Sequence, residues 1–156
     1  STGGFTDCLL QAGAGKVFAL DVGYGQLAWK LREDPRVVVI ERTNIRHYDG
    51  ADLDEKPGLA VIDVSFISLK TVIPPVLALI KETAQILALI KPQFEAAREE
   101  VGPNGVVGDE TVHERILLEI KEFCDFKGLD VAGTCLSPLL GPAGNKEFFI
   151  LSQKRP

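Results

Sequence analysis

The 156-residue chain has no methionine, few cysteines and no long apolar run. Cys8, Cys124 and Cys135 are odd in number and widely spaced, and no CxxC pair occurs, so they indicate neither a disulfide framework nor a zinc site. No run approaches the roughly 20 apolar residues that a membrane span needs, and Pro74 and Pro75 interrupt the longest candidate. These absences favour a cytoplasmic protein that does not cross a membrane.

The chain also has few histidines, no dinucleotide-binding motif and an excess of acidic over basic residues. His47 and His113 are the two histidines, and neither lies in a recognisable metal-ligand spacing, so we expect no metal. The sequence has no GxGxxG, which argues against a nicotinamide cofactor. The formal net charge is −5, whereas RNA-binding domains usually carry a basic face. This acidic balance argues against strong RNA affinity of the chain by itself.

Apolar runs and helical patterns alternate along the chain. We expect strands at residues 17–21, 37–41, 59–64, 84–90, 129–135 and 148–152. We expect helices at residues 5–12, 26–32, 69–81 and 109–127. The last two strands have no helix between them, which predicts an antiparallel hairpin at the edge of the sheet. The pattern predicts an α/β fold, a three-layer αβα sandwich whose sheet is mostly parallel and whose last strand is antiparallel.

Three local signals refine this picture. Thr111 to Glu114 match a capping box, which predicts the start of the longest helix. Residues 92–108 are rich in glycine, proline and polar side chains, so we expect a long loop, able to act as a lid.

The chain opens with a glycine-rich turn into a helix, and such a turn normally follows a strand. We therefore expect the first strand of the sheet to lie upstream of Ser1 and the chain to be a fragment.

Three charged residues lie where apolar runs meet solvent. Asp63 and Lys91 follow two of the predicted strands, and Glu147 precedes the last one. If the first two strands are parallel and the last is antiparallel, all three side chains meet at one edge of the sheet. Two carboxylates and an ammonium facing one crevice form an acid/base constellation. A structural ion-pair cluster is the alternative.

Six short segments, in order from end to end, closely resemble the TlyA/hemolysin A family. They are residues 1–7 (STGGFTD), 21–27 (DVGYGQL), 41–44 (ERTN), 63–69 (DVSFISL), 91–95 (KPQFE) and 144–147 (GNKE). That family belongs to the FtsJ-like ribose 2′-O-methyltransferases of ribosomal RNA, which use S-adenosylmethionine. The resemblance implies a Rossmann-like methyltransferase fold, with residues 1–156 as a single methyltransferase domain. The S4-like RNA-binding domain that family members carry upstream is absent from this chain.

The resemblance also implies a binding site for S-adenosylmethionine. Glycines at a helix start let backbone N–H groups approach an anionic group, and an acid that ends the next strand is able to accept ribose hydroxyls. A plain glycine turn and a solvated strand end are the alternatives. The residues implied are Ser1, Thr2, Gly3, Gly4, Asp21, Val22, Asn44 and Asp63.

In the resemblance Asp63, Lys91 and Glu147 match three members of a catalytic Lys-Asp-Lys-Glu tetrad. Lys91 is the expected base, Asp63 aligns it, and Glu147 orients the cation or the substrate hydroxyl. The fourth member is a lysine upstream of the missing strand, so we expect this fragment alone to be poorly active.

The implied partner is ribosomal RNA, free or in an assembled subunit, bound mainly through the absent N-terminal domain. Two rival interpretations remain: a membrane-active hemolysin, and a non-catalytic domain that binds the cofactor or acts as a scaffold.

Overall fold

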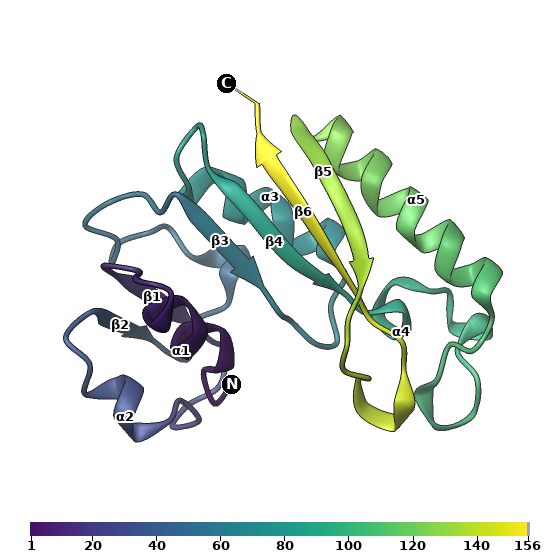
Figure 1. The fold of residues 1–156 in the computed structure, drawn as a ribbon, viewed down its shortest axis with the longest axis horizontal. Coiled ribbons are helices and arrows are strands. Elements are labelled where there is room, and N and C mark those ends of the chain that lie inside the picture. Colours follow the sequence, from purple (N-terminus) through teal and green to yellow (C-terminus); the bar gives the residue numbers. More distant parts are fainter. Residues whose placement is uncertain (156) are drawn as a thin grey trace. The chain divides into compact units, whose positions relative to one another are not determined.

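A computed structural model describes residues 1–155, which divide into two compact units, Ser1–Glu55 and a second unit that begins at Lys56. Each unit has its own hydrogen-bonded sheet, and strands alternate with helices along most of the chain (Figure 1). This alternation is the α/β pattern that the sequence predicts. Within residues 1–155 no helix combines the length and the apolar character that a membrane span requires.

The first unit is a two-stranded parallel sheet with short helices. Val17 pairs with Val37 and Leu20 with Ile40, so β1 and β2 end at the same edge. Buried leucines from α1, α2 and the segment before α2 pack against the valines of both strands and form the core. The elements are α1 (Gly4–Gln11), β1 (Val17–Leu20), α2 (Trp29–Arg32), β2 (Val37–Ile40) and the 3-10 turn η1 (Ile45–His47).

The second unit is a four-stranded sheet in the order β3-β4-β6-β5. β3 and β4 are parallel, and β6 runs antiparallel to both β4 and β5. A bulge between Val131 and Gly133 interrupts the ladder of the edge strand β5. The main elements are β3 (Leu59–Ile62), α3 (Leu69–Leu79), β4 (Gln85–Ile90), α4 (Pro92–Glu95), α5 (Glu110–Phe126), β5 (Leu129–Leu136) and β6 (Phe148–Lys154).

The hairpin of β5 and β6 at the sheet edge confirms the sequence prediction. The helices α3 and α5 contact each other, and their buried residues include Ile73, Ile116 and Ile120. Pro74 and Pro75 lie within α3, which continues past both of them. The apolar stripes of both helices therefore form the core of this unit.

The predicted helix at residues 109–127 is confirmed as α5, but its cap is not the threonine that the capping-box motif suggests. The capping residue is Asp109, whose carboxylate accepts hydrogen bonds from both the N–H and the hydroxyl of Thr111, each at 2.8 Å. Thr111 is thus a donor inside the first turn, and the helix begins two residues earlier than the capping-box motif suggests. An aspartate is as good an N-cap as threonine, and here it lies directly before the first helical residue.

Residues 92–108 were predicted as a long loop, but the structure shows an ordered series of short turns. These are α4, η2 (Arg98–Glu100) and η3 (Pro103–Gly105). Val107 is buried and anchors the end of the series, because its N–H donates to Asn145 Oδ1 (3.0 Å) and its carbonyl lies 2.8 Å from His113 Nε2. The segment is therefore fixed to α5 and to the β5–β6 connection at its C-terminal end.

Candidate functional site

The strongest cluster of the second unit lies where β3 and β4 end. Because the two strands are parallel, Asp63 and Lys91, which follow them, meet at the same edge. Lys91 Nζ forms an ion pair with Asp63 Oδ1 at 2.7 Å. The lysine side chain is only 12% exposed, whereas the aspartate is 40% exposed. The pair thus places a shielded amine beside a carboxylate that solvent or a ligand reaches.

Two neighbours of this pair were not singled out from the sequence. Ser65 Oγ lies 3.3 Å from Lys91 Nζ and accepts a hydrogen bond from the amine. Phe66 is 91% exposed and has a backbone φ of 63°, a left-handed conformation that costs a non-glycine residue roughly 1–3 kcal/mol. Its ring lies 5.0 Å from that of Phe94, tilted by 49°. An aromatic side chain is thus presented to solvent next to the Asp63–Lys91 pair.

The third predicted residue, Glu147, lies at the same edge but has a different partner. Ile90 pairs with Phe148, so Lys91 and Glu147 face each other one position beyond the paired ends of β4 and β6. Glu147 is only 6% exposed, and its Oε1 accepts a hydrogen bond from Gln93 Nε2 at 3.1 Å. In the described part of the chain no ion pair joins it to Lys91.

Glu95 connects two of the motifs at this edge. Its carboxylate accepts hydrogen bonds from the Ser68 hydroxyl (2.6 Å) and from the Leu69 N–H (2.7 Å), at the first turn of α3. Burial raises the pKa of Glu95, although both hydrogen bonds oppose this rise. The segment that follows β3 and the segment that follows β4 are therefore tied together beside the ion pair.

The residues predicted to bind a cofactor gather in the first unit, apart from Asp63. Asp21 follows β1 and accepts hydrogen bonds from the Gly23 N–H (2.7 Å) and from the Ser1 amino group. Partial burial raises the pKa of Asp21, and the hydrogen bond from the Gly23 N–H acts in the opposite direction. Gly3 has a φ of 96° and caps α1, and a side chain on it would overlap Leu27 and Leu31. Gly4, in contrast, has open space where a side chain would be.

The segments that follow β1 and β2 are joined to one another at their common edge. The Arg42 N–H donates to the Gly23 carbonyl, and the Thr43 N–H donates to the Asp21 carbonyl, each at 3.0 Å. The Arg42 guanidinium lies over the Tyr24 ring at 4.0 Å, and Arg42 has a left-handed backbone with a φ of 54°. The predicted residues that follow β1 thus share one small surface with the start of the segment that follows β2.

Three side chains on this surface differ in what they offer to a ligand. Val22 is largely exposed. The Asn44 side-chain oxygen accepts the Arg46 N–H (3.1 Å) and caps η1, so it already has a partner. The Arg32 guanidinium donates to Glu41 and holds the pKa of that carboxyl below its ordinary value. Asp21 is therefore the acid here without an arginine partner.

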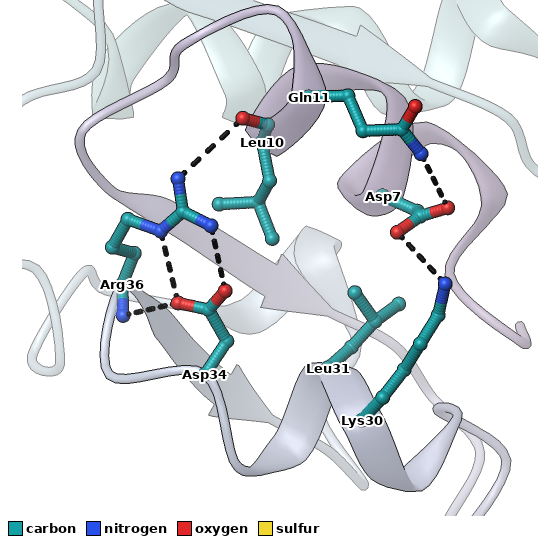
Figure 2. Close-up of a pocket in the computed structure, with 7 residues that line it drawn as sticks. All are labelled: Asp7, Leu10, Gln11, Lys30, Leu31, Asp34 and Arg36. Carbon is teal, nitrogen blue, oxygen red and sulfur yellow. Dashed lines mark hydrogen bonds and ion pairs between the residues drawn. The ribbon is translucent and has the colours of Figure 1, made fainter.

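A separate hollow of about 170 Å³ lies between α1 and α2 (Figure 2). Its charged side chains pair with one another: Lys30 with Asp7 at 3.1 Å, and Arg36 with Asp34 at 2.7 Å. None of the residues implied in cofactor binding or catalysis lines it. Because its charges are already compensated, we assign no ligand to this hollow.

The family model described as FtsJ-like methyltransferase matches residues 1–154. The chain belongs to this family. The resemblance that the six motifs indicated is thereby confirmed, although the motifs alone missed Ser65, Phe66 and Gln93. The signal for these three was present, because all of them lie inside the motif segments 63–69 and 91–95.

Longer proteins are similar to this FtsJ-like methyltransferase chain. It is 50% identical over 151 residues to YqxC of Bacillus subtilis, named a candidate rRNA methyltransferase, and covers 54% of that protein. It is 49% identical over 150 residues to TlyA of Mycobacterium tuberculosis, named a 16S/23S rRNA (cytidine-2′-O)-methyltransferase, and covers 56% of it. It is 44% identical to hemolysin A of Brachyspira hyodysenteriae, of which it covers 62%. Each alignment includes at least 95% of the chain, which therefore spans little more than half the length of these relatives.

Solved structures agree with the family assignment. A protein of Streptococcus thermophilus described as a candidate hemolysin matches 99% of this chain and 56% of its own with a TM-score of 0.96 at 46% identity. The N-methyltransferase NodS of Bradyrhizobium japonicum, solved with S-adenosyl-L-homocysteine, matches 99% of this chain and 74% of its own with a TM-score of 0.64 at 16% identity. The latter likeness shows the fold alone, and it confirms the predicted Rossmann-like α/β class.

Proposed function

We propose that the protein transfers a methyl group from S-adenosylmethionine to a ribose 2′-hydroxyl of ribosomal RNA. The observation that carries this proposal is the 2.7 Å ion pair of Lys91 and Asp63 at the strand ends of an FtsJ-like methyltransferase chain. Methylation of a hydroxyl requires a group that removes its proton, and a shielded amine held at a sheet edge is suited to that task. Residues 1–156 are the methyltransferase domain in this proposal.

The first unit is suited to hold S-adenosylmethionine, which supplies an electrophilic methyl group when bound. The helix α1 begins without a side-chain cap, and its first residue, Gly4, leaves the backbone open to a carboxylate. Asp21 offers a partly exposed carboxylate to the two hydroxyls of a ribose. Val22 and Asn44 would contact the adenine, and Ser1 and Thr2 would surround the methionine part. The donors and acceptors present thus fit the cofactor.

The second unit carries the residues that act on the substrate hydroxyl. In this proposal Lys91 is the base that accepts the proton of the substrate hydroxyl, so that the hydroxyl oxygen can bond to the methyl group. Asp63 fixes the direction of the Lys91 side chain and stabilises positive charge near the transferred methyl. Glu147, which directly precedes β6 and lies opposite Lys91, orients the substrate hydroxyl or the lysine.

The substrate class follows from the names of the relatives and from one side chain. YqxC and TlyA are both named for rRNA methylation. Phe66 presents an almost fully exposed ring beside the proposed catalytic pair, and nucleobases stack on such rings. Since the chain covers little more than half of these relatives, the remainder of the protein would provide much of the RNA contact.

The decisive test is transfer of labelled methyl from S-adenosylmethionine to ribosomal subunits and to free ribosomal RNA by the full-length protein. We expect label on one or a few riboses, mapped as 2′-O-methyl nucleotides. Lys91→Ala should lower the rate by roughly 100-fold to 10,000-fold, the usual contribution of a general base, while the cofactor affinity is kept. Lys81→Ala, which removes an exposed lysine after α3, is the matched control.

Two results would contradict the proposal. Absence of transfer to every ribosomal substrate would exclude the activity. Full transfer by the Lys91→Ala variant would exclude Lys91 as the base, and a protein that binds the cofactor without any transfer would be a scaffold.

A further inference from the structure

The carboxylate of Glu147 is enclosed from two sides. It precedes β6 and is 6% exposed, and in the described residues its side chain has no cationic partner. A buried carboxylate without a counter-charge is unfavourable unless hydrogen bonds compensate for the lost water. The compensating donor is Gln93 Nε2, at 3.1 Å from Oε1. In Figure 1, α4, which contains Gln93, and the β5–β6 connection lie at the same end of the four-stranded sheet.

On its second side the Glu147 carboxylate is enclosed by Gly141. Its backbone has φ −72° and ψ −179°, a conformation that every residue type adopts without strain. A Cβ on Gly141 would nevertheless lie 2.6 Å from Glu147 Cδ and would overlap its Oε1. A side chain on Gly141 would therefore displace the Glu147 carboxylate, although the chain conformation itself would accept any residue. The Gly141 N–H donates to the Asn145 carbonyl at 2.8 Å, which fixes this wall in place.

The orientation of the Gln93 amide shows what the hydrogen bond is for. The amide turns its Nε2 toward Glu147, whose Oε1 accepts the hydrogen bond. This leaves Gln93 Oε1 buried without a partner within the described chain. An unpaired buried acceptor costs free energy, and a glutamine that served packing alone would satisfy both ends of its amide or would be replaced by an apolar side chain.

We propose that Gln93 and Gly141 are positioning residues that aim the Glu147 carboxylate in the methyl-transfer reaction. This inference rests on the proposed function, in which Glu147 orients the reacting hydroxyl or the Lys91 amine. Gln93 fixes the direction of the carboxylate by its hydrogen bond, and Gly141 fixes its depth by close contact. Neither residue touches the reacting atoms; both act through Glu147.

The test measures kcat and KM of the full-length protein on ribosomal RNA with labelled S-adenosylmethionine. Gln93→Leu keeps the size of the side chain but cannot donate, and it should lower kcat by up to roughly 100-fold with little change in KM or cofactor affinity. Gln85→Leu is the matched control, because Gln85 is an exposed glutamine at the start of β4, at the end of that strand away from Gln93. Gly141→Ala should act like Gln93→Leu, and Gly58→Ala, where a Cβ meets open space, should not.

Gln93→Glu tests the positioning role through the pH dependence of the activity, which a purely structural role of Gln93 would leave unchanged. The variant places two carboxyl groups within hydrogen-bonding distance, and such a pair keeps its hydrogen bond only while it shares a proton. The activity of Gln93→Glu relative to wild type should therefore be highest at low pH and fall as pH rises. A kcat of Gln93→Leu equal to that of wild type would overturn the inference, and so would a pH profile of Gln93→Glu activity parallel to that of wild type. In either case the proposed function would stand. An inactive wild-type protein would overturn the proposed function and the inference together.

Discussion

At the scale of single residues, Lys91 and Phe66 have different proposed roles at the catalytic edge, Lys91 as the base and Phe66 as a contact to the substrate. Lys91 is shielded from solvent and contacts Asp63 and Ser65. These contacts fix the position of its amine, which suits a base that must meet the substrate hydroxyl in a defined orientation. Phe66 is exposed and held in a left-handed backbone, which suits a group that meets a large ligand. A strained, exposed aromatic residue contributes little to a core, and the proposed function gives Phe66 a role in substrate contact.

Replacing Phe66 by alanine should weaken the action on RNA and leave cofactor binding unchanged. Stacking of a base on an aromatic ring contributes about 1–3 kcal/mol, so kcat/KM should fall between roughly 5-fold and 150-fold. The measurement is steady-state methylation of ribosomal RNA beside calorimetric titration with S-adenosylmethionine.

Phe126→Ala is the matched control, because Phe126 is also a largely exposed phenylalanine and lies at the end of α5. Equal kinetics for the two variants would show that Phe66 does not contact the substrate.

At the scale of elements, the start of α3 depends on a residue from a different motif. Ser68 caps the helix by accepting the Lys70 N–H at 3.1 Å, and Glu95 accepts from both Ser68 and Leu69. A helix start leaves several N–H groups without partners, and a carboxylate beside them interacts favourably with the helix dipole. Through Glu95, the position of α3 is coupled to the segment that carries Lys91 and Gln93.

Glu95 should make the stability of the protein depend on pH in a defined direction. Its pKa is raised above the ordinary value of 4.5, chiefly by burial. The folded state therefore binds the proton more tightly than the unfolded state, and this contribution to the free energy of unfolding is full below about pH 4.5. It is lost as pH rises through the raised pKa.

Glu95→Gln removes this contribution. The difference in unfolding free energy between wild type and variant, measured by urea denaturation from pH 4.5 upward, should shift in favour of the variant as pH increases. Glu99→Gln, at an exposed position, should show no such trend. A wild-type-to-Glu95→Gln difference that is constant over pH would refute the linkage.

At the scale of the whole molecule, the cations are largely compensated within the chain. Lys146 pairs with Glu110, Lys154 with Glu82, and Arg155 with Asp130, at 2.9, 2.9 and 2.6 Å. With a formal net charge of −5, such a surface offers few free cations to phosphates.

Residues 1–156 alone should accordingly bind ribosomal RNA weakly, and the dissociation constant should change little with salt. The full-length protein should bind more tightly, with an affinity that falls steeply as salt increases, because each phosphate contact releases counterions. Filter binding or fluorescence anisotropy across a salt series measures both slopes. Tight, strongly salt-dependent binding by residues 1–156 would show that this domain carries the RNA-binding surface itself.

Much of this fold followed from the sequence, because its signals are local or depend on strand order. The strand runs, the hairpin and the meeting of Asp63 with Lys91 needed only apolar periodicity and the rule that parallel strands end at one edge. The partner of Glu147 was missed because Gln93 lies 54 residues away, and no pattern predicts a long-range amide contact. The cap at Asp109 and the ordered turns at residues 92–108 were missed because several polar residues compete locally for the same N–H groups.

The bulge in β5 has a consequence for how the molecule behaves in a crowded solution. A regular edge strand presents a row of unpaired N–H and C=O groups on which a strand of another molecule can assemble. The extra residue between Val131 and Gly133 breaks that row part-way along β5 and increases its local twist. The irregular edge therefore disfavours strand addition and protects the exposed side of the sheet against aggregation.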